Sequence, residues 1–494
     1  EKEPQKPNVI FILADDIGQG DVGVYHRERT GQPVVIPTPN MDYIAENGIR
    51  FRDANTPAAL CAPKRYSVMT GSNAYRCRNQ WGVWSAFDAS GAVADGQLTV
   101  GNVMQDAGYH TAFFGKWNLG GEWKKLDEGE GYPGSENWDD GWDYSKIIDH
   151  YPNVLGFDYS FELPLGIQNL PMAYYENGEW YPISDSSRLV VKKHSWTSRE
   201  VNIRGDYMKG DSKWTTEIAG PMLAQRASDY IRNHRKENPD QPFFIYYCSQ
   251  AVHLPHEPPI QFHGTPVLNT TPSRHGDMIY ELDLQLGMLL KTLRKEGLYE
   301  NTLIIFTSDN GGLGSRIEGH DPSNGFRGGK GQRWEGGTRV PVMAMWPGKI
   351  PEGKVSDEPV MAHDLMATMY ALIRQNMPED QAMDSYNILP LLLNEPGAKG
   401  REKEYYQGDL SVPRDNDHFK HIYREGYWKL IIDSNKQADI NVPEALFNLK
   451  DYPAEVDSLN MIDDSEQQYR IQRMYEEYKR IRETGERTTE PVRF

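Results

Sequence analysis

The chain has 494 residues, of which 38% are hydrophobic and 25% charged, so it can bury a large core as a globular protein. Its 71 acidic and 53 basic residues give a formal net charge of −18, which argues against a nucleic-acid partner because such a partner requires a broad basic face. The three cysteines are too few for a disulfide framework, and no apolar run approaches the ~18 residues of a membrane span.

The first residues, Glu1 to Pro7, are charged and include prolines, which is typical of the start of a processed mature chain. The absence of a leader does not by itself distinguish a cytoplasmic chain from one whose export signal has been cleaved. Our expectation is a periplasmic or secreted protein whose leader has been removed. The apolar run Val9 to Leu13 then predicts a strand that is covered on both faces, and it ends at Asp15 and Asp16.

The next predicted helices cover residues 39–47 and, after Pro63, residues up to Met69. Because proline has a fixed φ and no N–H group, Pro63 suits the first position of a helix. Cys61 would then lie at the helix N-terminus, where free N–H groups favour an anion, although a small buried thiol is an equally good interpretation. Four cations nearby form either a local basic island or a solvated surface: Lys64, Arg65, Arg76 and Arg78.

Strands and helices alternate through the middle of the chain. Strands are predicted at residues 109–114, 243–247 and 303–306, and helices at residues 99–107, 217–235 and 277–293. This alternation predicts an α/β fold in which a mostly parallel central sheet is sandwiched by helices.

Two stretches depart from that pattern. Residues 120–215 are rich in Gly, Trp, Tyr, Asp and Ser, which predicts a loop-rich insertion. After residue 400 the pattern changes to short strands and a charged helix at residues 464–482. We expect a main α/β domain over residues 1–400 and a smaller C-terminal α+β subdomain, with a short antiparallel sheet, over residues 401–494.

Four predicted strands end in polar side chains. In open parallel sheets, ligands bind outside the carboxyl ends of the strands. These ends carry Asp15 and Asp16, Lys116, His253, and Asp309 and Asn310. Three carboxylates and an amide oxygen are hard ligands that suit Ca²⁺ or Mg²⁺. One Asp pair alone is more often a cap or a turn, but the four ends together predict a site.

The segment Cys61-Ala62-Pro63-Lys64-Arg65, followed by Met69-Thr70-Gly71, resembles the signature of the type I sulfatases of the alkaline phosphatase-like superfamily. Further blocks occur in the family's order: Phe11 to Asp16, Gly115-Lys116-Trp117, Thr307 to Gly311, Gly328-Gly329-Lys330-Gly331, and Glu335 to Pro341. Among members of the family, the chain resembles bacterial sulfatases that act on polysaccharides and other glycans.

The resemblance implies the cofactors and the site. In the family the signature cysteine is converted to formylglycine by a formylglycine-generating enzyme, which would be a partner of this chain during maturation. One Ca²⁺ is implied, with these ligands: Asp15, Asp16, Asp309, Asn310 and modified Cys61. A second set is implied around the sulfate: Arg65, Lys116, His253 and Lys330. The formylglycine hydrate would attack sulfur, and His253 would protonate the departing alcohol oxygen.

One catalytic position departs from the family. The family usually has histidine where this chain has Asn118, and assigns it to removing a proton when the aldehyde is regenerated. An amide forms hydrogen bonds but is not a base, so Asn118 is expected to orient the hydrate while the proton goes elsewhere. Lys64 is a smaller departure, because serine or threonine is common there.

Other residues are candidates for substrate binding. His253 is preferred over His256 because it lies ten residues after Phe243, as the family's histidine does, so His256 either contacts substrate or shapes its loop. Four basic residues lie between the metal motif and Gly336, and they either bind sulfate or carboxylate groups or belong to a solvated loop: Arg316, His320, Arg327 and Arg333. Three tryptophans near the motifs either contact sugar or pack internally: Trp84, Trp123 and Trp334.

We therefore favour a sulfuric ester hydrolase that removes sulfate from a sulfated carbohydrate. A phosphonate or phosphate ester hydrolase of the same superfamily is the second hypothesis, because such enzymes can share the cysteine signature. A non-catalytic protein that binds sulfated glycans is the third, motivated by Asn118. The sequence leaves open which sugar and hydroxyl carry the sulfate, whether cleavage is at chain ends, and the oligomeric state.

Overall fold

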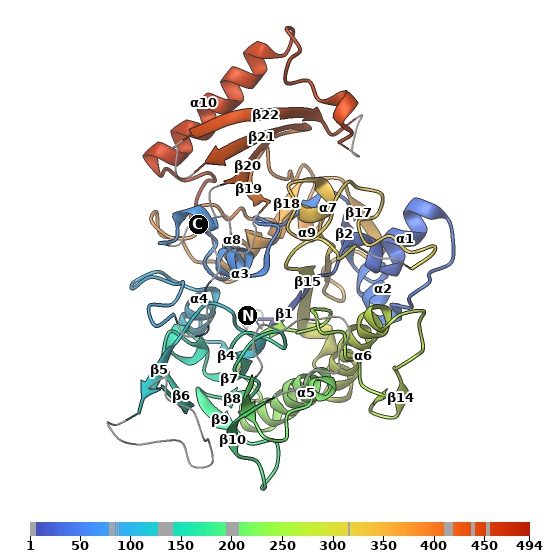
Figure 1. Cartoon of the computed structure of the whole chain (residues 1–494), viewed down its shortest axis with the longest axis vertical. Coiled ribbons are helices and arrows are strands. Elements are labelled where there is room, and N and C mark those ends of the chain that lie inside the picture. Colours follow the sequence, from blue (N-terminus) through green and yellow to red (C-terminus); the bar gives the residue numbers. More distant parts are fainter. Residues whose placement is uncertain are drawn as a thin grey trace, which may run out of the picture. The chain divides into compact units, whose positions relative to one another are not determined.

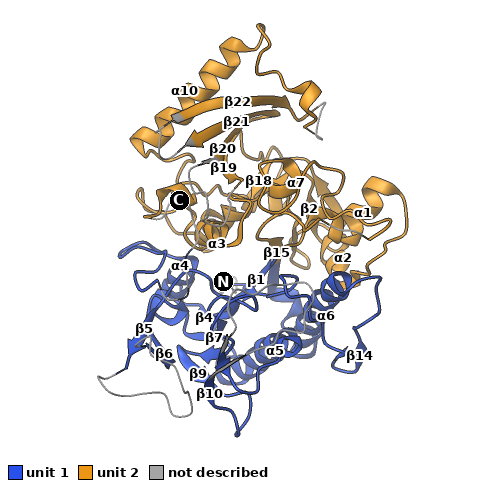
Figure 2. Cartoon of the chain, viewed as in Figure 1, with its two compact units in different colours: residues 1–15, 84–304 blue, residues 16–83, 305–494 orange. Residues whose placement is uncertain are grey.

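The computed structural model describes residues 6–78, 84, 86, 88–126, 142–193, 207–314, 317–409, 418–435, 440–450 and 455–494. The chain divides into two compact units, coloured separately in Figure 2. Unit 1 comprises residues 1–15 and 84–304, and unit 2 comprises residues 16–83 and 305–494. The chain therefore first passes from unit 1 to unit 2 between the two aspartates that follow the first strand.

Unit 1 contains a mixed sheet with a parallel part. Its parallel strands lie in the order β1 (Asn8–Ala14), β12 (Phe243–Cys248), β4 (His110–Lys116) and β7 (Tyr159–Leu163). Every residue of β1 and β12 is buried, which explains why their sequences are continuous apolar runs rather than alternating patterns.

The predicted insertion consists largely of short strands in its described part. After β7 the sheet continues through antiparallel strands β8 (Tyr174–Glu176), β9 (Glu179–Tyr181), β6 (Trp142–Asp149) and β5 (Glu122–Lys125). A separate antiparallel pair is formed by β10 (Leu189–Lys193) and β11 (Tyr207–Asp211). Residues 127–141 and 194–206 of the insertion lie outside the described residues.

Three helices of unit 1 were predicted from the sequence: α4 (Val100–Asp106), α5 (Ala219–Glu237) and α6 (Arg274–Lys295). The side chain of Ser273 caps α6 by accepting a hydrogen bond from the Gly276 N–H at 3.0 Å. α5 and α6 pack against each other, as Figure 1 shows. A short hairpin, β13 (Gln261–Phe262) and β14 (Thr265–Pro266), precedes α6.

Unit 2 contains α1 (Gly23–Thr30), α2 (Pro39–Glu46), β2 (Ile49–Phe51), β3 (Ala54–Asn55), α3 (Cys61–Thr70) and the carboxyl end of β15 (Thr302–Ser308). Further along are α7 (Glu335–Thr338), β16 (Val342–Met345), β17 (Lys354–Ser356), β18 (Val360–Met361), α8 (Leu365–Leu372) and α9 (Leu389–Leu392). β2 pairs antiparallel with β16 and parallel with β17, whereas β18 pairs parallel with β3.

The C-terminal part of unit 2 is an antiparallel sheet with one helix packed along it (Figure 1). The strands are β19 (Lys403–Gly408), β20 (His418–Glu425), β21 (Trp428–Asn435) and β22 (Ile440–Asn448), and the helix is α10 (Gln468–Thr484). Leu430 and Leu446 of the sheet pack against Ile471 and Met474 of α10. The predicted C-terminal antiparallel sheet is therefore confirmed, as is the α/β class with its large, mostly parallel sheet.

The domain boundary at residue 400 stays a prediction. Residues on both sides of it belong to unit 2, and the division between the two units falls elsewhere. Among the described residues, no helix combines the length and the apolar composition needed to cross a membrane.

The start of α3 differs from the prediction. The helix begins at Cys61, two residues before Pro63, because Leu60 is extended at φ −139° and ψ 148° and the chain turns into the helix directly after it. Pro63 is thus the third helical residue, where its missing N–H costs no hydrogen bond, since the first N–H groups of a helix have no intrahelical acceptor. Cys61 is the first residue of the helix rather than the residue before it.

Candidate functional site

In unit 2, several residues predicted to bind the metal ion or the sulfate group lie around Asp16. The Asp16 N–H donates to Asp309 Oδ1 at 3.0 Å, and Asn310 Nδ2 donates to Asp16 Oδ1 at 2.8 Å. The Lys330 ammonium lies 2.7 Å from the Asp16 carboxylate. The residues Asp16, Asp309 and Asn310 are fully buried, so these oxygen and nitrogen atoms interact with little screening by water.

Helix α3 adds a cation to this group. Arg65 Nη2 lies 2.8 Å from the second carboxylate oxygen of Asp309, and both side chains are at most 2% exposed. Cys61 and Arg65 are four residues apart in the helix and so lie on one face of it, and Cys61 is 6% exposed. Lys64 is also buried and donates to the carbonyl of Ser308 at the end of β15, so it does not belong to a solvated surface.

The donor set in unit 2 fits a divalent cation. Within the described part of the chain, Asn310 Oδ1 is buried and accepts no hydrogen bond, whereas its Nδ2 donates to Asp16 and to the Gly311 carbonyl. A buried acceptor without a donor costs free energy, which a cation bound at Oδ1 would offset. Carboxylate and amide oxygens are the ligands that Ca²⁺ prefers.

Unit 1 brings two further candidates together. Lys116 Nζ lies 2.7 Å from Asp15 Oδ2, and both side chains are fully buried. The main chain of Asp15 is fixed by two hydrogen bonds to the loop after β12, one to the Ala251 carbonyl at 3.0 Å and one from the Val252 N–H at 2.7 Å. The carboxyl ends of β1, β4 and β12 therefore meet in unit 1, as the strand pattern predicted.

The loop after β12 carries His253 and His256. His253 Nδ1 lies 2.8 Å from the Leu254 carbonyl, which only accepts hydrogen bonds, so Nδ1 is the donor in this contact and Nε2 takes no part in it. The ring of His256 packs on the ring of His275 at the start of α6, with centroids 4.9 Å apart. His256 thus has a structural contact in unit 1, and its role toward substrate stays a prediction.

Asn118 adopts a left-handed backbone conformation, with φ at +58°, and is 7% exposed. Its N–H donates to the Pro164 carbonyl at 2.9 Å. Asparagine and histidine are both enriched in this region of backbone space, so the local fold suits this chain's residue and the family's residue alike.

Three predicted substrate ligands have acidic partners within unit 2. His320 pairs with Asp21, Arg327 with Asp457 and Arg333 with Asp409. The side chain of His320 is 3% exposed and its Nε2 lies 2.8 Å from Asp21 Oδ1, so the two residues form a buried contact inside unit 2. As substrate ligands these three residues stay predictions, and Arg316 lies outside the described residues.

The tryptophans divide into two kinds. Trp84 and Trp123 are each 1% exposed, which favours the packing interpretation for both. Trp334 contacts two guanidinium groups, with Arg327 Cζ 3.7 Å and Arg333 Cζ 4.5 Å from its ring centroid. The segment that contains Lys330 is therefore followed by an aromatic residue in contact with two cations.

Sequence reasoning missed the residues that hold this segment. Lys429 of β21 is fully buried, and its Nζ lies 2.9 Å from the Arg333 carbonyl, 2.9 Å from Glu335 Oε1 and 2.7 Å from Glu455 Oε1. Burial raises the pKa of Glu335, but the nearby charges of Lys429 and Arg339 outweigh burial and hold that pKa well below its usual range. A lysine inside the otherwise apolar run from Trp428 to Ile432 was the only sequence signal for this arrangement.

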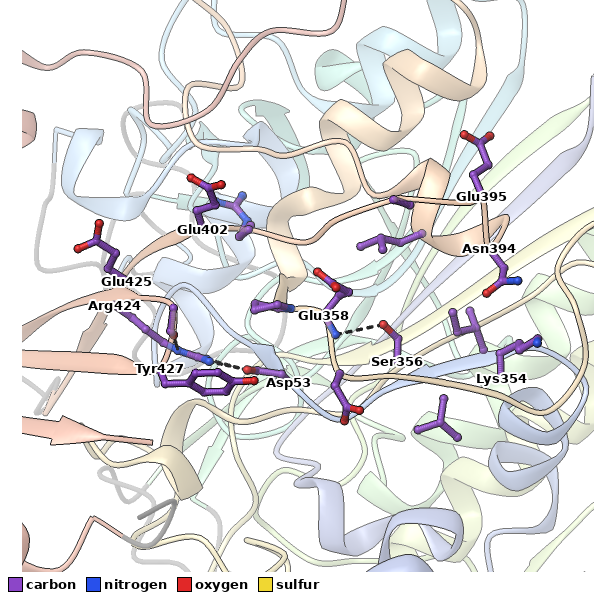
Figure 3. A pocket seen from close by; sticks show the side chains of 18 residues that line it. Asp53, Lys354, Ser356, Glu358, Asn394, Glu395, Glu402, Arg424, Glu425 and Tyr427 are labelled. Carbon is purple, nitrogen blue, oxygen red and sulfur yellow. Dashed lines mark hydrogen bonds and ion pairs between the residues drawn. The ribbon is translucent and has the colours of Figure 1, made fainter. Parts of the chain in front are cut away.

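A large cavity in unit 2 is separate from these residues. It has a volume of about 740 Å³ and is shown in Figure 3, where Arg424 pairs with Asp53 and the Glu358 N–H donates to Ser356 Oγ. None of the predicted site residues that the structure describes lines it.

Family models and curated relatives that match this chain are described as sulfatases or sulfohydrolases, and together the matches cover most of its length. The family described as "Sulfatase" matches residues 7–374, and the family described as "N-sulphoglucosamine sulphohydrolase, C-terminal" matches residues 329–484. An N-acetylgalactosamine-6-O-sulfatase of Bacteroides thetaiotaomicron is 30% identical over 470 residues, covering 88% of this chain and 84% of the relative. The human N-acetylgalactosamine-6-sulfatase is 29% identical over 414 residues, covering 82% of this chain and 69% of the relative.

Solved structures agree with these sequence matches. A structure from work on the metabolism of multiple glycosaminoglycans by Bacteroides thetaiotaomicron is 26% identical to this chain with a TM-score of 0.77. It covers 97% of this chain and 100% of the solved one, so the similarity extends over both units.

Proposed function

The chain belongs to the sulfatase family, as a type I sulfatase of the alkaline phosphatase-like superfamily, and on this premise we propose that it hydrolyses sulfate esters of a carbohydrate. The observation that carries the substrate class is the 30% identity to an N-acetylgalactosamine-6-O-sulfatase over 88% of this chain. The net reaction is the transfer of a sulfuryl group from the sugar to water, which gives the sugar with a free hydroxyl group and inorganic sulfate.

The proposed metal ligands are Asp16, Asp309 and Asn310, together with Asp15, which precedes Asp16 in the chain, and modified Cys61. The buried Asn310 Oδ1, which accepts no hydrogen bond within the described residues, supports this assignment to one Ca²⁺. When bound, the ion supplies positive charge to the anionic oxygens of the site, and formylglycine at residue 61 supplies a nucleophilic oxygen in place of the thiol.

The remaining roles fall to cationic and hydrogen-bonding side chains. Arg65, Lys116 and Lys330 are proposed to bind the sulfate oxygens, where fixed positive charges stabilise the charge that develops in the transition state. His253 is proposed to donate a proton from Nε2 to the departing alcohol oxygen, since its Nδ1 is held by the Leu254 carbonyl. These assignments are supported by the family's motif at each position.

Maturation and location follow from the same family membership. We propose that a formylglycine-generating enzyme converts Cys61, and that the protein acts in the periplasm or outside the cell. The similarity to a bacterial N-acetylgalactosamine-6-O-sulfatase supports both parts of this proposal.

The proposed function is tested by comparing a 6-sulfated N-acetylhexosamine with phosphate and phosphonate esters of the same sugar. Release of sulfate from the sulfated sugar, measured by ion chromatography, is expected to be much faster than hydrolysis of either phosphorus ester. A clear preference for a phosphorus ester would contradict the proposal, as would tight binding of the sulfated sugar with no sulfate release by protein fully converted at residue 61.

Removal of divalent cations with EGTA is expected to abolish sulfate release and to lower Tm. Without a cation, the buried carboxylates of Asp16 and Asp309 lose a ligand that binds only the folded state. The rate of sulfate release and the Tm measured by calorimetry should both recover when Ca²⁺ is added back. Full activity in protein shown by elemental analysis to contain no divalent metal would rule out the proposed metal site.

The variant Asn118→His is expected to keep or increase the turnover rate. The left-handed backbone at this position accepts histidine, and an imidazole adds a base that the amide lacks. The measurement is kcat for a sulfated sugar, with Asn118→Ala as the matched variant that adds no base. If Asn118→His abolishes activity, the amide itself shapes the substrate site.

A further inference from the structure

A pocket in unit 1 has an apolar floor and a basic rim. It has a volume of about 400 Å³ and lies between α5, α6 and the β13–β14 hairpin, which are drawn in green in Figure 1. Phe262 of the hairpin and Leu284 and Met288 of α6 pack together as its floor. Four basic side chains form the rim of this basic pocket: Arg232, His263, Lys291 and Lys295.

The charge of the basic pocket is opposite to that of the chain. Among the residues that the structure describes, no carboxylate lines it, although the chain has a net charge of −18. Arg232 pairs with Asp229 at 2.5 Å, but within the described residues Lys291 and Lys295 form no ion pair. The pocket is therefore a local positive site on an acidic protein, where an anionic ligand is favoured over a cationic one.

The stability of α6 does not account for this arrangement. Leu284, Met288, Lys291 and Lys295 follow one another at helical spacing along one face, and the two lysines are four residues apart, where like charges repel. The helix dipole favours Lys295 at the C-terminus, but Arg232 belongs to α5 and His263 to the turn between β13 and β14.

A glycine in the interior of α6 also lines the pocket. Gly287 lies more than three turns from the helix start, where glycine is disfavoured relative to alanine, and its missing side chain leaves the pocket open. The helix thus carries an unfavourable residue at the point where the pocket needs space.

We propose that the basic pocket binds an anionic segment of the sulfated carbohydrate chain, at a distance from the ester that is cleaved. This inference rests on the proposed function. Sulfate or carboxylate groups of the chain would bind Lys291 and Lys295, and the C–H faces of a sugar ring would pack on Phe262, Leu284 and Met288. Binding of one polymer at two places raises its affinity without any new contact at the reacting ester.

The covalent chain limits how far the pocket lies from the histidine loop. Five residues lie between His256 and Phe262, so their Cα atoms lie at most about 22 Å apart. An oligosaccharide of several sugars is therefore long enough to contact both segments of unit 1.

The test compares the double variant Lys291→Ser/Lys295→Ser with Lys213→Ser/Lys236→Ser, which removes two exposed lysines of unit 1 outside the pocket. The probes are a chondroitin 6-sulfate hexasaccharide and N-acetylgalactosamine 6-sulfate. The first variant is expected to raise KM for the hexasaccharide about tenfold, with kcat and the monosaccharide kinetics unchanged. Equal KM values for the two variants, or equal losses on both probes, would overturn the inference.

Direct binding separates this inference from the proposed function. If the wild-type protein releases sulfate from neither probe, the proposed substrate is wrong, and calorimetric titration with the hexasaccharide then tests the pocket alone. Weaker binding by Lys291→Ser/Lys295→Ser than by the control supports the pocket. Equal binding by both variants contradicts it.

Discussion

Replacement of Cys61 by alanine is expected to lower the rate of sulfate release by roughly 10⁴-fold or more, because it removes the precursor of the nucleophile. The fold should tolerate the change. Cys61 is the first residue of α3, alanine is a good helix former, and the loss of one buried sulfur atom should change the free energy of unfolding by about 1 kcal/mol or less.

The matched control is Cys77→Ala, which removes another buried thiol of unit 2 that lies outside the signature. Ion chromatography of released sulfate and urea unfolding are measured on both variants. Cys77→Ala should keep the wild-type rate. A Cys61→Ala variant that retains more than about a hundredth of that rate would show that residue 61 does not supply the nucleophile.

The variant Lys429→Met is expected to lower the free energy of unfolding of unit 2 by about 3–5 kcal/mol, since removing one partner leaves a buried charge uncompensated. Two carboxylates lose their ammonium partner, those of Glu335 and Glu455, and the Arg333 carbonyl loses a hydrogen bond. Sulfate release should also fall, because the same contacts hold the segment that carries Lys330.

The control for this variant is Lys450→Met, which removes an exposed lysine just after β22 and should leave stability within about 0.5 kcal/mol of wild type. In the double variant Lys429→Met/Glu455→Gln, one buried carboxylate is removed, so part of the lost stability should return. Urea unfolding measures all three variants. A loss below about 1 kcal/mol for Lys429→Met would show that the buried network does not hold this segment.

Much of the fold could be predicted because its pattern is local. The apolar run at Val9 to Leu13 and the helical spacing of leucines in α6 identify a strand and a helix from their own residues alone. The predicted start of α3 was wrong for a related reason. The preference of proline for the first helical position is a local rule, and the extended conformation of Leu60 placed that start at Cys61 instead.

The candidate site could be predicted from the sequence where polar residues follow the ends of strands. Asp309 and Asn310 follow β15 and contact Asp16, the second residue after β1, as the pattern of polar strand ends predicted. Lys330 lies in a loop without such a pattern, and only the resemblance to the family identified it.

Long-range ion pairs could not be read from the sequence. The acidic partners of His320, Arg327 and Arg333 lie 299, 130 and 76 residues away from them in the chain. A cation in a loop has no local feature that tells whether it pairs with such a residue or faces solvent. For the same reason, Lys429 could be recognised as unusual in its strand, whereas its partners Glu335 and Glu455 could not be identified.

The chemistry proposed for this sulfatase depends on the oxidation state of residue 61. The decisive measurement is mass spectrometry of the tryptic peptide that spans this residue, taken from protein expressed with a formylglycine-generating enzyme and shown to release sulfate. The peptide is predicted to carry formylglycine at residue 61. Fully active protein whose peptide carries only an unmodified cysteine would contradict the proposed mechanism.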